Sequence, residues 1–332
     1  MKQVHFTAFG EPKDVILCAD VADVGEPGDG EIVVDIDAFP INPADLLTIS
    51  GGYAVKPDLP ATLGAEGTGR VTAIGDGVSD LALGDRVIMI ERNNWCQRRR
   101  VAAGAVVKMP GDADVLQLAM LKVNPATALM MLRHYVDLAP GDWVIQNAAN
   151  SGVGTSLIKL AKADGVRSIN VVRRPELIEG LKKLGADVVV VDGEDLAERV
   201  AETTGQQAAK LAIDAVGGTQ ITRLADCLAE GGTVVNYGLL SGEPCQIRAD
   251  QTIFKGITLT GFWLQKMLTS MAKPDVQKLY QDLGARVLSG DLAVQVEATY
   301  PIEQIKDAVA HAGQGHRNGK ILVLPNGPIP KH

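Results

Sequence analysis

The sequence predicts an α/β protein with two domains, one built on a doubly wound parallel sheet and one on an antiparallel, partly barrel-like β structure. Three observations lead to this prediction. The chain has 332 residues, more than one ordinary domain of about 100–150 residues requires. Its first part holds short β segments separated by Gly, Pro and Asp, and its middle part alternates strands with helices. Such alternation is typical of parallel strands joined by right-handed crossovers.

The first domain is expected to start at the N-terminus and to extend to residue 116. Its clearest strands are the apolar runs at 31–38, 69–74 and 85–90, whose spacing favours an antiparallel sheet over βαβ units. A helical stretch over 117–135 then opens the second domain.

The second domain is predicted at 117–265. The predicted strands are 143–147, 168–172, 188–191, 211–215, 233–237 and 258–264, and the predicted helices are 156–163, 175–184, 196–203 and 221–228. The last of these strands is apolar on both sides and is expected at the edge of the sheet. Residues 266–332 predict helices over 276–288 and 302–312 and a strand over 320–324. We expect this segment to return to the first domain, which is then discontinuous.

Composition argues against several classes of protein. A formal net charge of −8 disfavours broad binding to nucleic acids or to anionic membranes. No run approaches the roughly 20 apolar residues that cross a bilayer. The four cysteines form no CxxC pair, as expected for reduced thiols in a cytosolic protein. The opening residues show neither an apolar signal core nor an Arg/Ser-rich transit segment, so we expect a cytoplasmic protein.

A glycine-rich turn follows the first strand of the second domain. Gly152 and Gly154, preceded by Asn150 and Ser151, open a helix, where a tight turn and helix N-terminus can accept a pyrophosphate. The third fingerprint glycine is replaced by Leu157, and an isolated GxG is as often a simple βα turn. Its position between a strand and a helix, at the start of a βαβ series, favours a dinucleotide site in a Rossmann domain.

Two arginines follow the next strand. Arg173 stands 21 residues after Gly152, where an NAD site usually carries an acid for the ribose 2′-hydroxyl. An arginine there suits the 2′-phosphate of NADP, although Arg173 and Arg174 also fit a solvated strand end. The pattern favours NADP over NAD.

The chain resembles a known family along nearly its whole length. The quinone oxidoreductase branch of the zinc-free medium-chain dehydrogenase/reductases is indicated by INPAD (41–45), GAEGTGRV (64–71) and LGDRV (83–87). Mitochondrial-type trans-2-enoyl-CoA/ACP (enoyl thioester) reductases are indicated by QNAANSGVG (146–154), INVVRR (169–174), VGG (216–218), GGTVVNYG (231–238), IFK (253–255) and GFWL (261–264). The resemblance implies a GroES-like catalytic domain beside the Rossmann domain, and a homodimer.

The resemblance also implies site residues. The implied NADPH contacts are Asn124, Asn150, Ser151, Gly152, Val153, Gly154, Arg173, Arg174, Tyr237, Gly238, Leu239, Phe262, Trp263, Leu264 and Lys320. Relatives often read Arg-Asp-Arg after the second strand where this chain reads Arg-Arg-Pro, which leaves the second phosphate ligand open. Taken without the resemblance, Phe262 and Trp263 fit core or dimer packing better than cofactor contact.

Zinc ligands of the related alcohol dehydrogenases are missing. Residues 42–45 contain no Cys, and Ala65 stands where the related enzymes carry a His, whereas catalytic zinc needs three protein ligands. The five histidines show no ligand spacing. Without a metal ion, the reduction of a simple ketone has no Lewis acid to polarise the carbonyl. Reduction of an activated C=C is therefore the easier reaction to explain.

That reaction requires a proton for the α-carbon of the substrate. A tyrosine stays protonated at neutral pH, and Tyr53, in a Gly-rich loop, matches the family's proton-donor tyrosine. The alternatives are a packing role for Tyr53 and a water held by Asn42.

The resemblance predicts NADPH-dependent reduction of trans-2-enoyl thioesters of coenzyme A or an acyl carrier protein. Reduction of quinones, enones or enals is the alternative, and a non-catalytic, crystallin-like NADPH binder is a further one. The run Arg98-Arg99-Arg100 could bind the phosphates of coenzyme A or an acidic carrier protein, but a solvated strand is the preferred interpretation.

Overall fold

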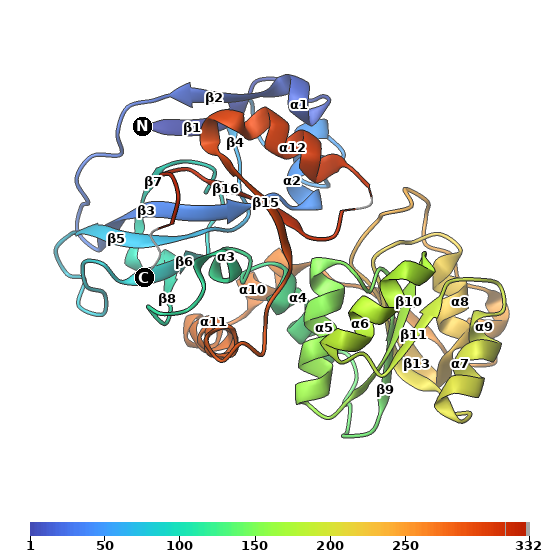
Figure 1. Ribbon diagram of the computed structural model, residues 1–332. Helices are drawn as coiled ribbons and strands as arrows, with labels where there is room; N and C mark the ends of the chain where they lie inside the picture. The colour runs from blue at the N-terminus through green and yellow to red at the C-terminus, as the bar shows by residue number, and fades with distance from the viewer. Residues whose placement is uncertain (316, 330–332) are drawn as a thin grey trace. The chain divides into compact units, whose positions relative to one another are not determined.

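The structure, a computed structural model, describes residues 1–315 and 317–329 and divides into two compact units (Figure 1). Unit 1 combines Met1–Val123 with the segment that begins at Ala272, and unit 2 is Asn124–Met271. Both boundaries lie several residues after the predicted 116/117 and 265/266. The first moves because Lys122 Nζ and the Val123 amide both donate to unit 1, at 2.5 Å to Ala65 O and 2.7 Å to Glu66 Oε2.

Unit 1 is a mainly antiparallel β structure closed by the C-terminal segment, whose two strands pair in parallel. One sheet has the order β15-β16-β3-β5-β6-β8 with β7 paired to β3, and a smaller sheet has the order β2-β1-β4. Strand β16 runs antiparallel to β3, with Leu322 opposite Pro40. The elements are β1 (Lys2–Phe6), α1 (Pro12–Val15), β2 (Ile16–Asp20), β3 (Glu31–Pro40), α2 (Pro43–Ser50), β4 (Ala61–Thr62), β5 (Thr68–Ile74), β6 (Arg86–Met89), β7 (Arg98–Ala102), η1 (Ala103–Ala105), β8 (Val106–Lys108), α3 (Val115–Ala119), α11 (Lys273–Leu288), β15 (Val296–Pro301), η3 (Ile302–Gln304), α12 (Ile305–Gly313) and β16 (Lys320–Leu324).

Helix α12 covers the core of unit 1 together with α1 and α2 (Figure 1). Its apolar positions recur at helical spacing, so Ile305, Ala308 and Val309 are buried on one face against the strands. Helix α12 therefore buries the apolar face that its helical period predicts.

Unit 2 is a doubly wound sheet of six parallel strands in the order β11-β10-β9-β12-β13-β14. The predicted α/β fold class is confirmed, and β14 lies at the predicted edge. The elements are α4 (Asn124–His134), β9 (Trp143–Gln146), α5 (Gly152–Ala163), β10 (Arg167–Val172), η2 (Pro175–Leu177), α6 (Ile178–Leu184), β11 (Val188–Val191), α7 (Leu196–Thr204), β12 (Ala209–Asp214), α8 (Gln220–Asp226), β13 (Leu228–Asn236), α9 (Ala249–Ile253), β14 (Thr258–Gly261) and α10 (Leu264–Ser270).

Helices pack on both faces of this sheet. On one face Ile158 of α5 and Leu181 of α6 meet Val172, and on the other Leu196 of α7 and Leu224 of α8 join a cluster with the opposite side chains of the same strands. Strands buried on both faces need near-continuous apolar runs, and this is the pattern that the sequence showed.

Among the predicted elements whose bounds differ from the observed ones, two differ for a reason that the hydrogen bonds show. The helical stretch over 117–135 is two helices, α3 and α4, because residues 120–123 leave the helix to make the contacts of Lys122 and Val123 described above. The strand over 258–264 ends at Gly261: the Phe262 amide makes a last bond to Asn236 O at 2.8 Å, and Trp263 then caps α10.

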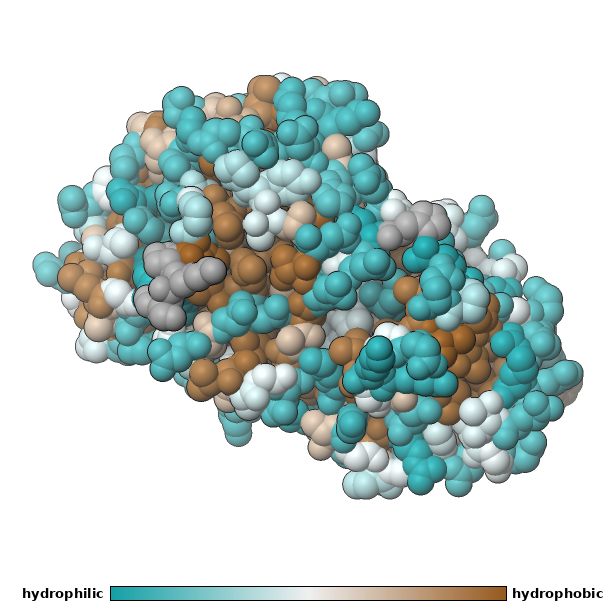
Figure 2. Space-filling model, in the orientation of Figure 1, coloured by the Kyte–Doolittle hydropathy of each residue, from teal (hydrophilic) through white to brown (hydrophobic). Residues whose placement is uncertain are grey.

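The surface is mixed in polarity. Figure 2 shows hydrophilic residues over much of the visible face, with hydrophobic patches among them. Within the described residues, no helix combines the length and the apolar character needed to cross a bilayer.

Candidate functional site

The predicted cofactor residues of unit 2 follow the carboxyl ends of its parallel strands. The turn with Gly152 comes after β9, Arg173 after β10, Tyr237 after β13 and Phe262 after β14. Because all six strands are parallel, these ends form one edge of the sheet, which is where open α/β sheets bind their ligands.

The glycine turn is tight and cannot accept larger residues. A Cβ on Gly154 would lie 2.5 Å from Ala149 O, so only glycine lets α5 begin this close to the strand end. Ala148 has a positive φ of 46°, an uncommon conformation that marks a constrained turn. Ser151 caps α5 by accepting the Gly154 amide at 3.1 Å, and the neighbouring residue Asn150 is exposed.

Asn124 lies directly against this turn. It is 7% exposed, and a Cβ on Gly152 would approach its Nδ2 at 3.0 Å. Nδ2 has no hydrogen-bond partner among the described residues, and a buried unsatisfied amide is costly. An unpaired donor beside a glycine turn fits a dinucleotide, whose polar groups would supply the missing acceptor.

The two arginines after β10 differ in their surroundings. Arg173 is exposed, whereas Arg174 is half-buried and its Nε lies 3.4 Å from Glu176 Oε1. The sequence placed Arg173 at the position of the ribose-binding acid and left the role of Arg174 open. The structure makes Arg173 the more accessible candidate for a 2′-phosphate, since Arg174 is already ion-paired.

The other predicted contacts of unit 2 lie along the same edge. Burial raises the pKa of Tyr237 well above its usual range, and a hydrogen bond with Ser151 lowers it by a smaller amount. Gly238 approaches the backbone too closely for a side chain, since its Cβ would lie 2.5 Å from Ala215 O. The side chains that follow are of mixed exposure: Val153 and Phe262 are buried, Leu264 is half-buried, and Leu239 and Trp263 are exposed.

A buried carboxylate that the sequence analysis missed organises this edge. Asp214, fully buried at the end of β12, accepts bonds of 2.5 Å from Asn147 Nδ2 and from Asn236 Nδ2. It also accepts the Gly217 amide at 2.9 Å. Asp214 thus ties together the ends of β9, β12 and β13. An acidic residue closing an apolar strand was the available signal.

Tyr53 lies in unit 1, in the loop after α2. The helix ends at Gly51, whose φ of 78° is left-handed, and the Tyr53 amide donates to Leu47 O at 3.0 Å. Its side chain is half-buried.

Asn42, by contrast, is buried in a charged network. It is 2% exposed, its Nδ2 donates to Glu66 Oε1 at 2.8 Å, and its Oδ1 accepts from Lys320 Nζ at 2.5 Å. Lys320, predicted as a cofactor contact, therefore lies in unit 1 with its ammonium turned toward Asn42. Neither Glu66 nor this network was predicted from the sequence.

Side chains that do not bind zinc stand at the positions of the zinc ligands of the related alcohol dehydrogenases. Ala65 and Asn42 are both buried, and Asn42 uses its amide within the network. In the described part of the chain, no three His, Cys, Asp or Glu side chains gather as a metal site. His316 and His332 lie outside the described residues.

The arginine run of β7 is paired within unit 1. Arg98 Nε lies 2.6 Å from Asp35 Oδ1, Arg99 donates to Asn93 O at 2.5 Å, and Arg100 Nε lies 3.5 Å from Glu31 Oε2. These contacts support the preferred interpretation of the run as an ordinary strand.

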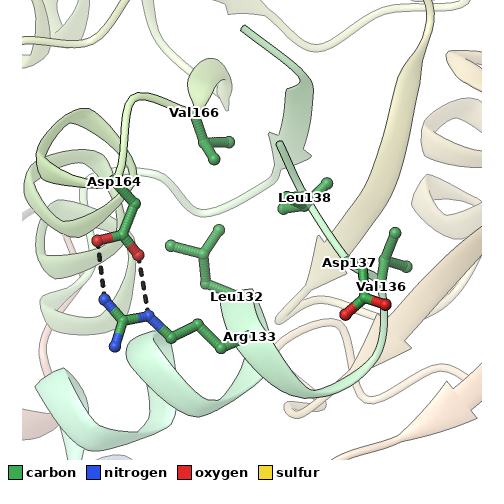
Figure 3. A pocket seen from close by; sticks show the side chains of 7 residues that line it. All are labelled: Leu132, Arg133, Val136, Asp137, Leu138, Asp164 and Val166. Carbon is green, nitrogen blue, oxygen red and sulfur yellow. Dashed lines mark hydrogen bonds and ion pairs between the residues drawn. The ribbon is translucent and has the colours of Figure 1, made fainter. Parts of the chain in front are cut away.

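Unit 2 also contains a pocket of about 210 Å³ (Figure 3). It is lined by Leu132, Arg133, Val136, Asp137, Leu138, Asp164 and Val166. Arg133 and Asp164 form a bidentate pair at its wall (Figure 3). Since it lies beside the amino end of β10, it is separate from the predicted cofactor edge, and it is smaller than the roughly 300 Å³ of typical ligand sites.

Comparison with known proteins agrees with this arrangement. Residues 28–117 match the alcohol dehydrogenase GroES-like domain, and residues 152–282 match the zinc-binding dehydrogenase family. The chain is 36% identical over 315 residues to the mitochondrial enoyl-[acyl-carrier-protein] reductase of Xenopus tropicalis, covering 92% of this chain and 89% of that protein.

Two solved structures are similar over almost the whole chain. The complex of Etr1p, a 2-enoyl thioester reductase of Candida tropicalis, with NADP and crotonyl-CoA has a TM-score of 0.87 at 30% identity, covering 97% of this chain and 99% of that one. Escherichia coli quinone oxidoreductase complexed with NADPH has a TM-score of 0.87 at 27% identity, covering 98% and 100%.

Fold, site and similarity together define an oxidoreductase with a GroES-like and a Rossmann-like domain. The chain belongs to the medium-chain dehydrogenase/reductase family, and it is homologous to the enoyl thioester reductases.

Proposed function

We propose that this protein catalyses the NADPH-dependent reduction of the C=C bond of trans-2-enoyl thioesters, without zinc. The observation that carries the proposal is the 30% identity, over 97% of the chain, to a protein solved with both NADP and crotonyl-CoA. The 36% identity to a mitochondrial enoyl-[acyl-carrier-protein] reductase supports it independently.

NADPH binding is assigned to the carboxyl edge of unit 2. The amides at the start of α5 would hold the pyrophosphate, Arg173 the 2′-phosphate, and Asn124 the nicotinamide end with its unpaired Nδ2. Bound there, NADPH would supply the hydride for the β-carbon of the substrate.

Tyr53 is assigned as the acid that protonates the α-carbon. Its backbone is anchored to α2, and its half-buried side chain remains accessible. Asn42 is less suited to hold a catalytic water, because its amide already joins Lys320 and Glu66.

The test is Tyr53→Phe, which removes the hydroxyl and keeps the ring. Because general acid catalysis contributes about 10²–10⁴-fold, we expect kcat for crotonyl-CoA to fall by that factor while NADPH affinity is retained. Tyr300→Phe is the matched control: Tyr300 is also half-buried in unit 1, and its hydroxyl bonds to His311 Nδ1 at 2.9 Å. It should reduce crotonyl-CoA normally.

Quinone reduction is the second candidate, favoured by the similarity to E. coli quinone oxidoreductase. A native protein that oxidises NADPH with quinones but not with crotonyl- or hexenoyl-thioesters would establish that candidate instead. Unchanged thioester reduction by Tyr53→Phe would remove the tyrosine from the mechanism.

A further inference from the structure

Four ionisable side chains are buried together in unit 1. The exposed fractions are 0% for Asp45, 1% for Glu66, 4% for Lys122 and 8% for Lys320. Burying charges costs several kcal/mol per ion, and apolar residues of similar size are often as stable. Stability alone is therefore a poor reason for this cluster.

Glu66 is the centre of the hydrogen bonds in this buried cluster. Its Oε1 accepts Asn42 Nδ2 at 2.8 Å, and Asn42 Oδ1 in turn accepts Lys320 Nζ at 2.5 Å. Both ends of the Asn42 amide are thus engaged, so the orientation of the amide is fixed by a carboxylate on one side and an ammonium on the other.

The second oxygen of Glu66 holds the backbone of Val123, where the first segment of unit 1 ends. Oε2 accepts the Val123 amide at 2.7 Å, and Val123 is followed by Asn124, the first residue of unit 2. Lys122 holds the same segment, since its Nζ donates to Ala65 O at 2.5 Å and its carbonyl accepts Tyr280 Oη at 3.1 Å.

Only a carboxylate satisfies this geometry. Each oxygen of Glu66 accepts one hydrogen bond: Oε1 from Asn42 Nδ2 and Oε2 from the Val123 amide. A protonated carboxyl or a glutamine has one good acceptor and turns a donor toward the other position. One of the two buried N–H groups would then lose its partner.

We propose that Glu66 is a positioning residue, whose carboxylate fixes the Asn42–Lys320 pair with one oxygen and, with the other, the backbone of Val123 next to Asn124. This inference rests on the proposed NADPH site, but not on the identity of the substrate that is reduced.

The charge of this cluster changes near neutral pH. Burial raises the pKa of Glu66 to about 7, opposed chiefly by Lys320 and by the bonds from Asn42 and Val123. Burial also lowers the pKa of Lys122 and of Lys320 to about 8, opposed chiefly by Glu66.

The surrounding groups modify this balance. Burial raises the pKa of Asp45. The hydrogen bond that it accepts from the Asn42 amide opposes this shift, as do the positive charges of Arg92 and Lys320. Tyr280, packed against Lys122, has its pKa raised by burial and by the charge of Glu66. The native protein should therefore lose the carboxylate contacts as the pH falls through about 7.

The experiment is a fluorescence titration of NADPH between pH 6 and pH 9, on the native protein and on Glu66→Gln. Leaving one buried donor unpaired should weaken NADPH binding roughly tenfold at pH 8. Native affinity should fall as Glu66 becomes protonated, whereas Glu66→Gln should show the weaker affinity without this pH dependence below pH 8.

Asp37→Asn is the matched control. Asp37 is also a partly buried carboxylate of unit 1, and it pairs with the buried Arg86, but it lies outside the network. We expect it to lower the melting temperature without changing the affinity for NADPH or its pH dependence. Should Glu66→Gln be insoluble, Glu66→Asp keeps the carboxylate and should keep the pH dependence.

Three results would overturn the inference: native-like affinity and pH dependence in Glu66→Gln, a pH-independent affinity in the native protein, or the same losses in Asp37→Asn. Failure of the proposed reaction is a separate outcome, since it would appear as normal NADPH binding without reduction of crotonyl-CoA.

Discussion

Gly154→Ala gives a direct test of the cofactor turn, because its effect can be worked out from the structure. The added Cβ would lie 2.5 Å from Ala149 O and 2.7 Å from Ala149 C and Cα, all backbone atoms that cannot rotate away. Reaching ordinary contact, which begins at 3.4 Å, requires the turn or α5 to move by about 0.9 Å.

Such overpacking costs about 1–3 kcal/mol. For a domain the size of unit 2, each kcal/mol lowers the melting temperature by about 2–4 °C. The displaced atoms belong to the turn that would present its amides to the pyrophosphate, so NADPH should also bind at least about tenfold more weakly, equivalent to ~1.4 kcal/mol. Thermal unfolding and a fluorescence titration measure the two effects.

Gly180→Ala provides the control in the same unit. Gly180 lies within α6, and its added Cβ would meet no atom within 4 Å. Alanine is favoured over glycine inside a helix by about 0.5–1 kcal/mol, so this variant should be slightly more stable and bind NADPH normally. A Gly154→Ala protein with native stability and native NADPH affinity would refute the argument from close approach.

Further predictions concern selectivity, metal, assembly and pH. Native protein should bind NADPH at least about tenfold more tightly than NADH; Arg173→Ala should remove most of this preference, and Arg174→Ala less of it, because Arg174 is paired with Glu176. Activity should survive chelators, whereas about one zinc per chain by elemental analysis, with activity lost on its removal, would contradict a zinc-free mechanism. Light scattering should give a dimer at micromolar concentration, since β14 is the edge strand of its sheet and a two-fold partner is a common way to cover such an edge; a monomer would rule this out. Burial raises the pKa of Glu66 from 4.5 to about 7, so between these pH values the folded protein keeps a proton that the unfolded protein releases. As the pH rises from 4.5 to 7, the free energy of unfolding of the native protein should therefore fall relative to that of Glu66→Gln, by up to about 1.4 kcal/mol per pH unit. Urea unfolding at pH 5 and pH 7 tests this, and an unchanged difference would show that Glu66 does not titrate in this range.

Local sequence patterns predicted most of unit 2. Its strands are short apolar runs and its helices have a regular period, so both are encoded by neighbouring residues. The strand over 188–191 and, in unit 1, the strand over 320–324 were predicted with the observed bounds. The glycine turn was readable because Gly152 and Gly154 meet a steric requirement that lies within a few residues of the chain.

Contacts between distant residues were not readable in this way. The two helices α3 and α4 looked continuous, because the bonds that interrupt them go to Ala65 and Glu66, more than fifty residues earlier. The spacing from Gly152 pointed to Arg173 and left the second phosphate ligand open, and only the structure showed that Arg174 is paired with Glu176.

By itself, the sequence determined the two-domain α/β architecture, the dinucleotide turn and the family resemblance, since each depends on local periodicity or on a short motif. Only the tertiary structure brought Asn42, Glu66 and Lys320 into one buried network and joined three strand ends through Asp214. The physical reason is that the charge and hydrogen bonding of a buried group depend on its partners in space, and these are supplied by segments far apart in the chain.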